Sequence, residues 1–262
     1  MSGKGFKQVW PPLTLLLAAI LLWEWTSARN MMGFWIIPSP SAVWKVFAEH
    51  PELMLRHVIP TLTASLSGFI LAFILGVITA LAMHSSSLIK RFIYPYLIVS
   101  QTVPIIAVAP LLILLFGFGI AAKIFTVVLV CFFPVALGFY DGLRQVPQEQ
   151  VLLLRSMGAG TWTIYRLLRI PASLPSLFTG LKLAATYSVM GAVIGEWLGG
   201  KAGLGIYMTR ATKSFQTAHV FAVILIIVAL SMALFGLVAL LDRILLAWHY
   251  KKQAEYEDPA EN

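Results

Sequence analysis

Charged residues are scarce in this chain of 262 residues. Asp, Glu, Lys and Arg together make up 11% of the sequence, whereas 59% is hydrophobic and the mean hydropathy is +0.86. Ordinary soluble domains carry about 25% charged residues. This deficit excludes a typical soluble domain and indicates a protein whose solvent is largely the lipid bilayer.

Cysteine is nearly absent, and the usual catalytic motifs are missing. The single cysteine, Cys131, excludes a disulfide framework and a Cys-x-x-Cys metal site, and it is interpreted as a small packing residue. The sequence contains no His-Glu-x-x-His helix, Ser/His/Asp set or carboxylate pair. The stretch 195–202 has the spacing of a phosphate-binding loop, but Ala202 stands where a hydroxyl would bind magnesium. We therefore predict no catalytic residue, no metal site and no cofactor.

Long apolar runs dominate the sequence instead. About 20 helical residues are needed to cross a hydrocarbon core of ~30 Å. Runs of this kind lie at roughly 11–28, 59–83, 93–117, 122–141, 176–198 and 219–247. The loops between them are too short for a folded soluble domain. We predict an all-α fold, in which residues 1–262 form a single bundle of six transmembrane helices with a cytoplasmic loop over residues 143–175.

The first run also has features of a secretory signal, because Lys4 and Lys7 precede an apolar core. That core ends in the bulky and charged segment 23–25, Trp-Glu-Trp, which suits an interfacial anchor better than a cleavage site. An uncleaved membrane helix is the favoured interpretation.

Basic residues predict the orientation of the chain. Lys and Arg are more numerous on the loops that share a side with the amino terminus, which predicts cytoplasmic amino and carboxy termini in a cell membrane protein. They are spread around the apolar runs rather than clustered on one face. The net charge of +8 therefore reflects membrane topology, and no nucleic-acid partner is predicted.

Two kinds of interruption within the apolar runs bear on transport. Pro104 and Pro110 predict a kinked or broken third span, which either fits the bundle or lines a solute path. Lys182 either extends its long side chain to the inner membrane interface, which is the favoured interpretation, or takes part in transport. Glu196, at the other end of the fifth span, either braces the outer loop or faces the translocation path.

The loop 143–175 contains two short amphipathic segments. The first runs from Gln148 to Met157 and is ended by Gly158. The second, Thr161–Arg169, carries mixed aromatic and basic residues, and Pro171 and Pro175 are predicted to close it. Such helices fit a groove on a partner protein or lie on anionic lipid, and the residues alone are compatible with both.

A family resemblance favours the partner protein. Gly158-Ala159, followed by Leu168–Pro171, resembles the coupling motif of the permease subunits of ATP-binding-cassette (ABC) importers. The residues that match are Gly158, Ala159, Ile170 and Pro171. In that family the motif docks into a cleft of the ATPase subunit, so the resemblance implies the same role here. Leu152–Leu154 stand where the family pattern has Glu-Ala-Ala.

Other segments resemble one group of permeases within this family. The stretch 37–44, IPSPSAVW, is similar to one found in permeases for nitrate, sulfonates, taurine and pyrimidine precursors of thiamine. Further matches are Val103-Pro104, Ala109-Pro110-Leu111, the Phe116–Gly119 segment before Lys123, Gly195-Glu196 and Gly203-Leu204-Gly205.

The resemblance implies a machine with several subunits. Two permease copies in the lipid bilayer would work with a cytoplasmic ATPase dimer and an extracytoplasmic solute-binding protein, and the permease itself would hydrolyse nothing. The solute would be a thiamine pyrimidine precursor or a sulfonate, taurine or nitrate. The alternative from another class is an ion-coupled secondary transporter, which would need acidic coupling sites in mid-span.

Overall fold

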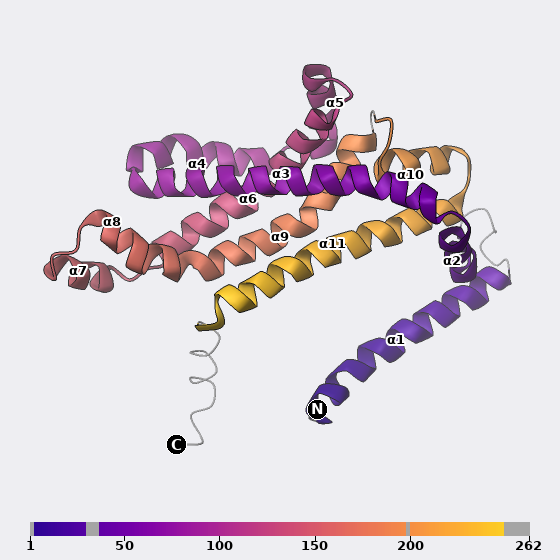
Figure 1. The fold of residues 1–262 in the computed structure, drawn as a ribbon, viewed down its shortest axis with the longest axis horizontal. Helices are drawn as coiled ribbons and strands as arrows, with labels where there is room; N and C mark the ends of the chain where they lie inside the picture. The colour runs from indigo at the N-terminus through magenta and orange to yellow at the C-terminus, as the bar shows by residue number, and fades with distance from the viewer. Residues whose placement is uncertain (1–2, 30–36, 198–199, 249–262) are drawn as a thin grey trace.

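The protein is helical throughout the parts described by the computed structural model, which are residues 3–29, 37–197 and 200–248 (Figure 1). The elements are α1 (Gly3–Ala28), α2 (Pro40–Glu49), α3 (Pro51–Ser85), α4 (Ser87–Thr102), α5 (Ile105–Phe116), α6 (Ile120–Arg144), α7 (Gln148–Ser156), α8 (Thr161–Ile164), η1 (Tyr165–Arg169), α9 (Ile170–Trp197), α10 (Leu204–Lys213) and α11 (Thr217–Leu245). The all-α prediction is confirmed. Both chain termini lie outside the described residues.

Four helices are long and apolar enough to cross a membrane. They are α3, α6, α11 and the continuous helix Thr161–Trp197 formed by α8, η1 and α9. A fifth span results if α4 and α5, which meet at an angle of 106°, are counted as one broken span. Among the described residues, length and composition thus support four or five spans rather than six. The predicted first span, 11–28, falls on α1, which is outside this set.

Helices α6 and α9 pack together at the centre, with α3 on one side and α11 on the other (Figure 1). Glycine permits the close approach of α6 and α9. A Cβ atom placed on Gly180 of α9 would lie 2.3 Å from the carbonyl oxygen of Pro134 of α6, and Gly138 of α6 faces the backbone of Gly180. Without a side chain at these positions the two backbones touch, as is common where membrane helices associate.

The predicted break in the third apolar run is present, and it falls at Pro104. Helix α4 ends at Thr102, and Val103 is extended, with φ −78° and ψ 121°. The residue before a proline avoids the helical region because of steric conflict with the proline ring. Pro110 lies within α5 and does not interrupt it. The chain therefore turns sharply only once in this run, at Val103-Pro104.

The prediction that Pro171 and Pro175 close the loop is wrong, because one helix runs through both from Thr161 to Trp197. A proline inside a helix lacks an N–H donor, and its ring conflicts with the preceding turn. Here the preceding turn is widened into a π-helix over Tyr165–Arg169, in which the N–H of Ile170 bonds to the carbonyl of Tyr165. The wider turn accommodates Pro171 without ending the helix.

Lys182 has a partner that the sequence did not indicate. Its ammonium group forms an ion pair with the buried carboxylate of Asp242, near the end of α11. Pairing lowers the cost of a charge inside a membrane span. The ion pair therefore holds α9 and α11 together at one point along their length.

Candidate functional site

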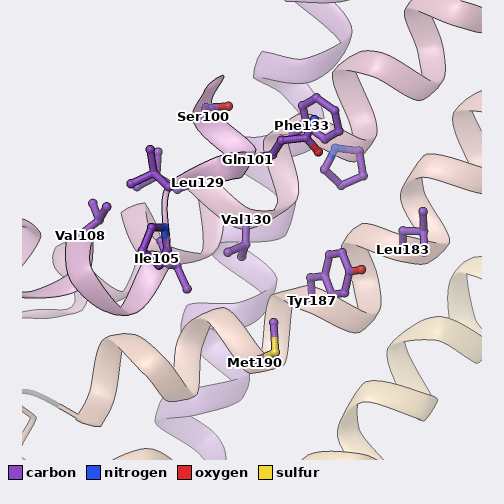
Figure 2. Close-up of a pocket in the computed structure, with 13 residues that line it drawn as sticks. Ser100, Gln101, Ile105, Val108, Leu129, Val130, Phe133, Leu183, Tyr187 and Met190 are labelled. Atoms are coloured by element: carbon purple, nitrogen blue, oxygen red, sulfur yellow. The ribbon is translucent and has the colours of Figure 1, made fainter. Parts of the chain in front are cut away.

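A cavity of about 650 Å³ opens at the break between α4 and α5 (Figure 2). Ser100 and Gln101 approach it from the end of α4, and Pro104 and Ile105 from the break itself. Residues of α6 and α9 form the opposite walls, with Tyr187 of α9 among them. The broken span thus creates a hollow beside the central helix pair.

The predicted translocation residues separate in the structure. Pro104 lines the cavity, whereas neither Pro110 nor Glu196 is among the described residues around it. Pro110 is exposed on α5. Glu196 is 0% exposed and is enclosed by protein at the far end of α9. The three residues therefore do not form one site.

Gly158 ends α7 in a specific geometry. Its φ is +81°, a left-handed conformation that glycine adopts without steric cost. The N–H of Gly158 donates to the carbonyl of Arg155 at 2.9 Å, and the N–H of Ala159 donates to the carbonyl of Leu154 at 2.9 Å. These two bonds form a Schellman motif, which satisfies the last carbonyls of the helix. The motif fixes the direction in which the chain leaves α7 towards α8.

The segment of α7, α8 and η1 presents large apolar side chains to the outside. The exposed ones are Leu152, Leu153, Met157, Trp162 and Leu167. Trp162 is 74% exposed. Of the four residues matched to the coupling motif, Gly158 is exposed and the other three, Ala159, Ile170 and Pro171, are half-buried. Gly158-Ala159 and Ile170-Pro171 thus flank this apolar surface rather than form its most exposed part.

The same segment is tied to the end of α3. The hydroxyl of Tyr165 lies 2.5 Å from Nδ1 of His84, and the two rings are in edge contact at 5.4 Å. The guanidinium of Arg169 lies 3.4 Å from the same nitrogen. His84 therefore links the π-helical turn to a second membrane span.

Glu196 lies at the centre of a buried polar cluster made of Thr61, Lys123, Glu196 and Gly205, which we call the Glu196 cluster. The ammonium of Lys123 lies 3.1 Å from Oε1 of Glu196, and the hydroxyl of Thr61 donates to both carboxylate oxygens at 3.0 and 2.9 Å. The N–H of Gly205 donates to Oε2 at 2.9 Å. Four elements, α3, α6, α9 and α10, meet in this cluster.

The start of α10 fits against the Glu196 cluster with little room to spare. Gly203 has a φ of +136°, and a Cβ atom there would lie 2.1 Å from the carboxylate of Glu196. The ring of His57 is stacked on Tyr207 at 4.8 Å, and Tyr207 also contacts His219. Burial raises the pKa of the Tyr207 hydroxyl, which therefore stays protonated at neutral pH.

Comparison with known proteins identifies the family. Residues 72–246 match the model of the family described as binding-protein-dependent transport system inner membrane component. This chain belongs to that family. The match begins within α3 and runs to the end of α11, so it covers the cavity, the segment of α7, α8 and η1, and most of the Glu196 cluster.

Relatives of this permease are named for different transported solutes. It is 35% identical over 94% of its length to the formylaminopyrimidine transport permease protein of Halalkalibacterium halodurans, 98% of which is covered. It is 32% identical to the riboflavin transport system permease protein of Chloroflexus aurantiacus, with 91% of each chain covered. It is 27% identical to the taurine transport system permease protein of Escherichia coli, with 97% of each chain covered.

A solved structure shares the fold. The inward-facing methionine ABC transporter MetNI contains a chain with a TM-score of 0.65 to this permease and 19% sequence identity. The likeness covers 76% of this permease and 98% of that chain. The architecture of the described helices is therefore that of an ABC transporter membrane domain.

Family membership sets the role of the chain. It is the inner-membrane permease component of a binding-protein-dependent ABC importer, it is not itself catalytic, and it works with ATPase and binding-protein partners. An ion-coupled secondary transporter, the alternative drawn from sequence, is incompatible with this membership.

Sequence reasoning missed the partners of the buried charges. Lys123 follows the loop after the third apolar run, where an ordinary outer-loop charge would stand, but it is 7% exposed and paired with Glu196. His84 stands at the end of the second apolar run, where a polar residue needs no partner. A signal was available for Lys123, because it lies four residues after Gly119 at the very start of an apolar run. No comparable signal marks His84.

Proposed function

We propose that this permease carries a small polar solute, released by an extracytoplasmic binding protein, across the inner membrane as one of two copies joined to an ATPase dimer. The solute is a thiamine pyrimidine precursor or a sulfonate, taurine or nitrate. Helix α1 supplies the sixth span, and both termini are cytoplasmic. The surface around α10, with Lys201, Arg210 and Lys213, faces the binding protein.

The observation that supports this proposal most strongly is a continuous connection between the cavity and the segment of α7, α8 and η1, which we call the coupling segment. The apolar surface of α7 and α8 is suited to a groove on the ATPase. From α8 a single helix continues through η1 into α9, which carries Leu183, Tyr187 and Met190 to the cavity wall. A shift of the ATPase surface therefore acts directly on a helix that lines the solute path. Gly158, Ala159, Ile170 and Pro171 set the angle at which α7 and the long helix meet the ATPase.

Replacement of Gly158 by Val tests the coupling role. A β-branched residue at a φ of +81° costs about 1–2 kcal/mol locally, so the chain is expected to leave α7 in another direction. We expect the amount of ATPase that co-purifies with the permease in detergent to fall at least tenfold. The measurement is the ATPase-to-permease ratio after affinity purification and size-exclusion chromatography.

Two matched variants separate conformation from side-chain bulk. Gly158→Asn retains access to the left-handed region and should keep the ATPase bound. Gly160→Val adds the same side chain two residues later, where φ is −70° and nothing lies within 4 Å of a Cβ atom. This variant should therefore also keep the ATPase bound. Equal ATPase recovery with Gly158→Val and wild type would refute the role of this turn.

Replacement of Tyr165 by Phe tests the link to α3. The change removes the hydroxyl that contacts His84 but leaves the ring in place. A hydrogen bond of this kind contributes about 1 kcal/mol. We expect ATP hydrolysis to persist while solute uptake per ATP falls several-fold in reconstituted vesicles, because the coupling segment moves with less effect on α3.

The control is Tyr96→Phe on α4. Tyr96 is 74% exposed and makes no hydrogen bond within the described part of the chain, so the same chemical change should leave the uptake-to-hydrolysis ratio as in wild type. If Tyr165→Phe also leaves that ratio unchanged, the contact with His84 is structural only.

A further inference from the structure

The cavity at the α4–α5 break carries no net charge. Of the described residues that line it, none is Asp, Glu, Lys, Arg or His. The nearest cation along the chain is Lys182, next to the lining residue Leu183, and it is held by Asp242 of α11. Lys123, on α6, is held by Glu196. Neither ammonium group is available to an anion in the cavity.

This environment lacks the groups that would stabilise an anionic solute. A carboxylate or sulfonate that leaves water without a cation or several hydrogen-bond donors loses hydration that nothing restores. Wall positions such as Leu129, Val130 and Met190 offer only apolar surface. The cavity therefore discriminates against fixed negative charge.

The uncharged polar side chains of the cavity can form the hydrogen bonds that an uncharged heterocycle needs. Gln101 makes no hydrogen bond within the described residues, so its amide offers a donor and an acceptor side by side. That pair is complementary to a ring nitrogen beside an amino or carbonyl group, as in the pairing of glutamine with adenine. The hydroxyl of Tyr187 is likewise uncommitted among the described contacts, and Ser100 donates its hydroxyl proton to the carbonyl of Leu97 and keeps its oxygen as an acceptor.

Flat apolar surfaces complete the match. Phe133 and Tyr187 present aromatic rings to the cavity, and Met190 adds a polarisable thioether (Figure 2). Aromatic rings favour stacked or edge-on contact with another ring, and sulfur makes favourable contacts with ring edges. A planar ring can make favourable contacts with all three side chains, whereas a small tetrahedral anion has no flat surface for such contacts.

We infer that the cavity at the α4–α5 break is a transit site for an uncharged, planar nitrogen heterocycle. The amide of Gln101 hydrogen-bonds to the polar edge of the heterocycle, and the ring of Tyr187 contacts its face. The inference rests on the proposed function and narrows it: the aminopyrimidine class fits, and sulfonates, taurine and nitrate do not.

Saturation-transfer NMR on the purified permease–ATPase complex in nanodiscs tests the inference, because it detects weak ligands. The probes are formylaminopyrimidine and ethanesulfonate, each at millimolar concentration. We expect transfer to the ring protons of the heterocycle and none to the sulfonate. Gln101→Leu should weaken heterocycle binding about tenfold or more, and Tyr187→Leu several-fold.

The matched control is Gln145→Leu, the same chemical change at the exposed end of α6, which should bind the heterocycle as wild type does. Comparable transfer to ethanesulfonate, or heterocycle binding that is insensitive to Gln101→Leu and Tyr187→Leu, overturns the inference. The absence of transfer from either probe overturns it as well, because the cavity would then hold no solute.

A second readout separates this inference from the proposed function. ATP hydrolysis by the same preparation is measured with and without the binding protein. If the binding protein stimulates hydrolysis while the NMR result is negative, the importer role stands and the solute class inferred from the cavity fails. If hydrolysis is never stimulated, the proposed function itself fails.

Discussion

Replacement of Lys123 by Met is expected to destabilise the permease by about 3–5 kcal/mol, since it leaves the buried carboxylate of Glu196 without its counter-charge. Thr61 and the N–H of Gly205 would still donate to that carboxylate, but they do not neutralise it. The loss should appear as a large fall in the melting temperature of the detergent-solubilised protein and in the fraction that stays monodisperse on size-exclusion chromatography.

The double variant Lys123→Met with Glu196→Gln should recover most of this stability. The amide still accepts the hydrogen bond from Thr61, and no charge is left unpaired. Lys45→Met serves as the control, because Lys45 forms an exposed pair with Glu49 and such pairs contribute only about 0–1 kcal/mol. If the double variant is as unstable as Lys123→Met, the damage comes from lost packing at Lys123 and not from the unpaired charge.

Replacement of Gly180 by Ala should have the second large effect. The added methyl group would lie 2.3 Å from the carbonyl oxygen of Pro134, so α6 and α9 must separate. Overpacking of this kind typically costs about 1–3 kcal/mol, and here the obstacle is backbone that cannot rotate away. Thermal unfolding followed by intrinsic fluorescence should show a lower midpoint and a broader transition.

Gly236→Ala provides the matched comparison. Gly236 is exposed on α11, and nothing lies within 4 Å of a Cβ atom there. Alanine has a higher helix propensity than glycine by about 1 kcal/mol, so this variant should be unchanged or slightly more stable. A similar loss in both variants would mean that the loss at Gly180 does not come from the contact between α6 and α9, and no loss in either would mean that the two backbones have room for a side chain at Gly180.

Local sequence signals predicted the features that depend on neighbouring residues. The break at Pro104 and the helix end at Gly158 each follow from the backbone limits of one residue type, and both are present where the sequence places them. Apolar runs likewise predicted the spans on α3, α6, α9 and α11. Such features need no knowledge of what lies across the bundle.

Features that depend on partners far along the chain were not predictable. Lys123 and Glu196 are separated by 73 positions, and Lys182 and Asp242 by 60, so no periodicity connects them. The prediction for Pro171 failed for a different reason. Proline ends an ideal α-helix, but the turn before Pro171 is a wider π-helical turn, and no residue pattern marks such a turn in the sequence.

The uninterrupted helix from Thr161 to Trp197 has a mechanical consequence. At about 1.5 Å per residue its 37 residues form a rod roughly 55 Å long, enough to cross the bilayer and emerge on both sides. One end carries the exposed Trp162, and the other ends beside Glu196 and the start of α10. The two ends of the membrane domain are thus joined by a single element, so a rigid displacement of the end that carries Trp162 would also displace the end beside Glu196.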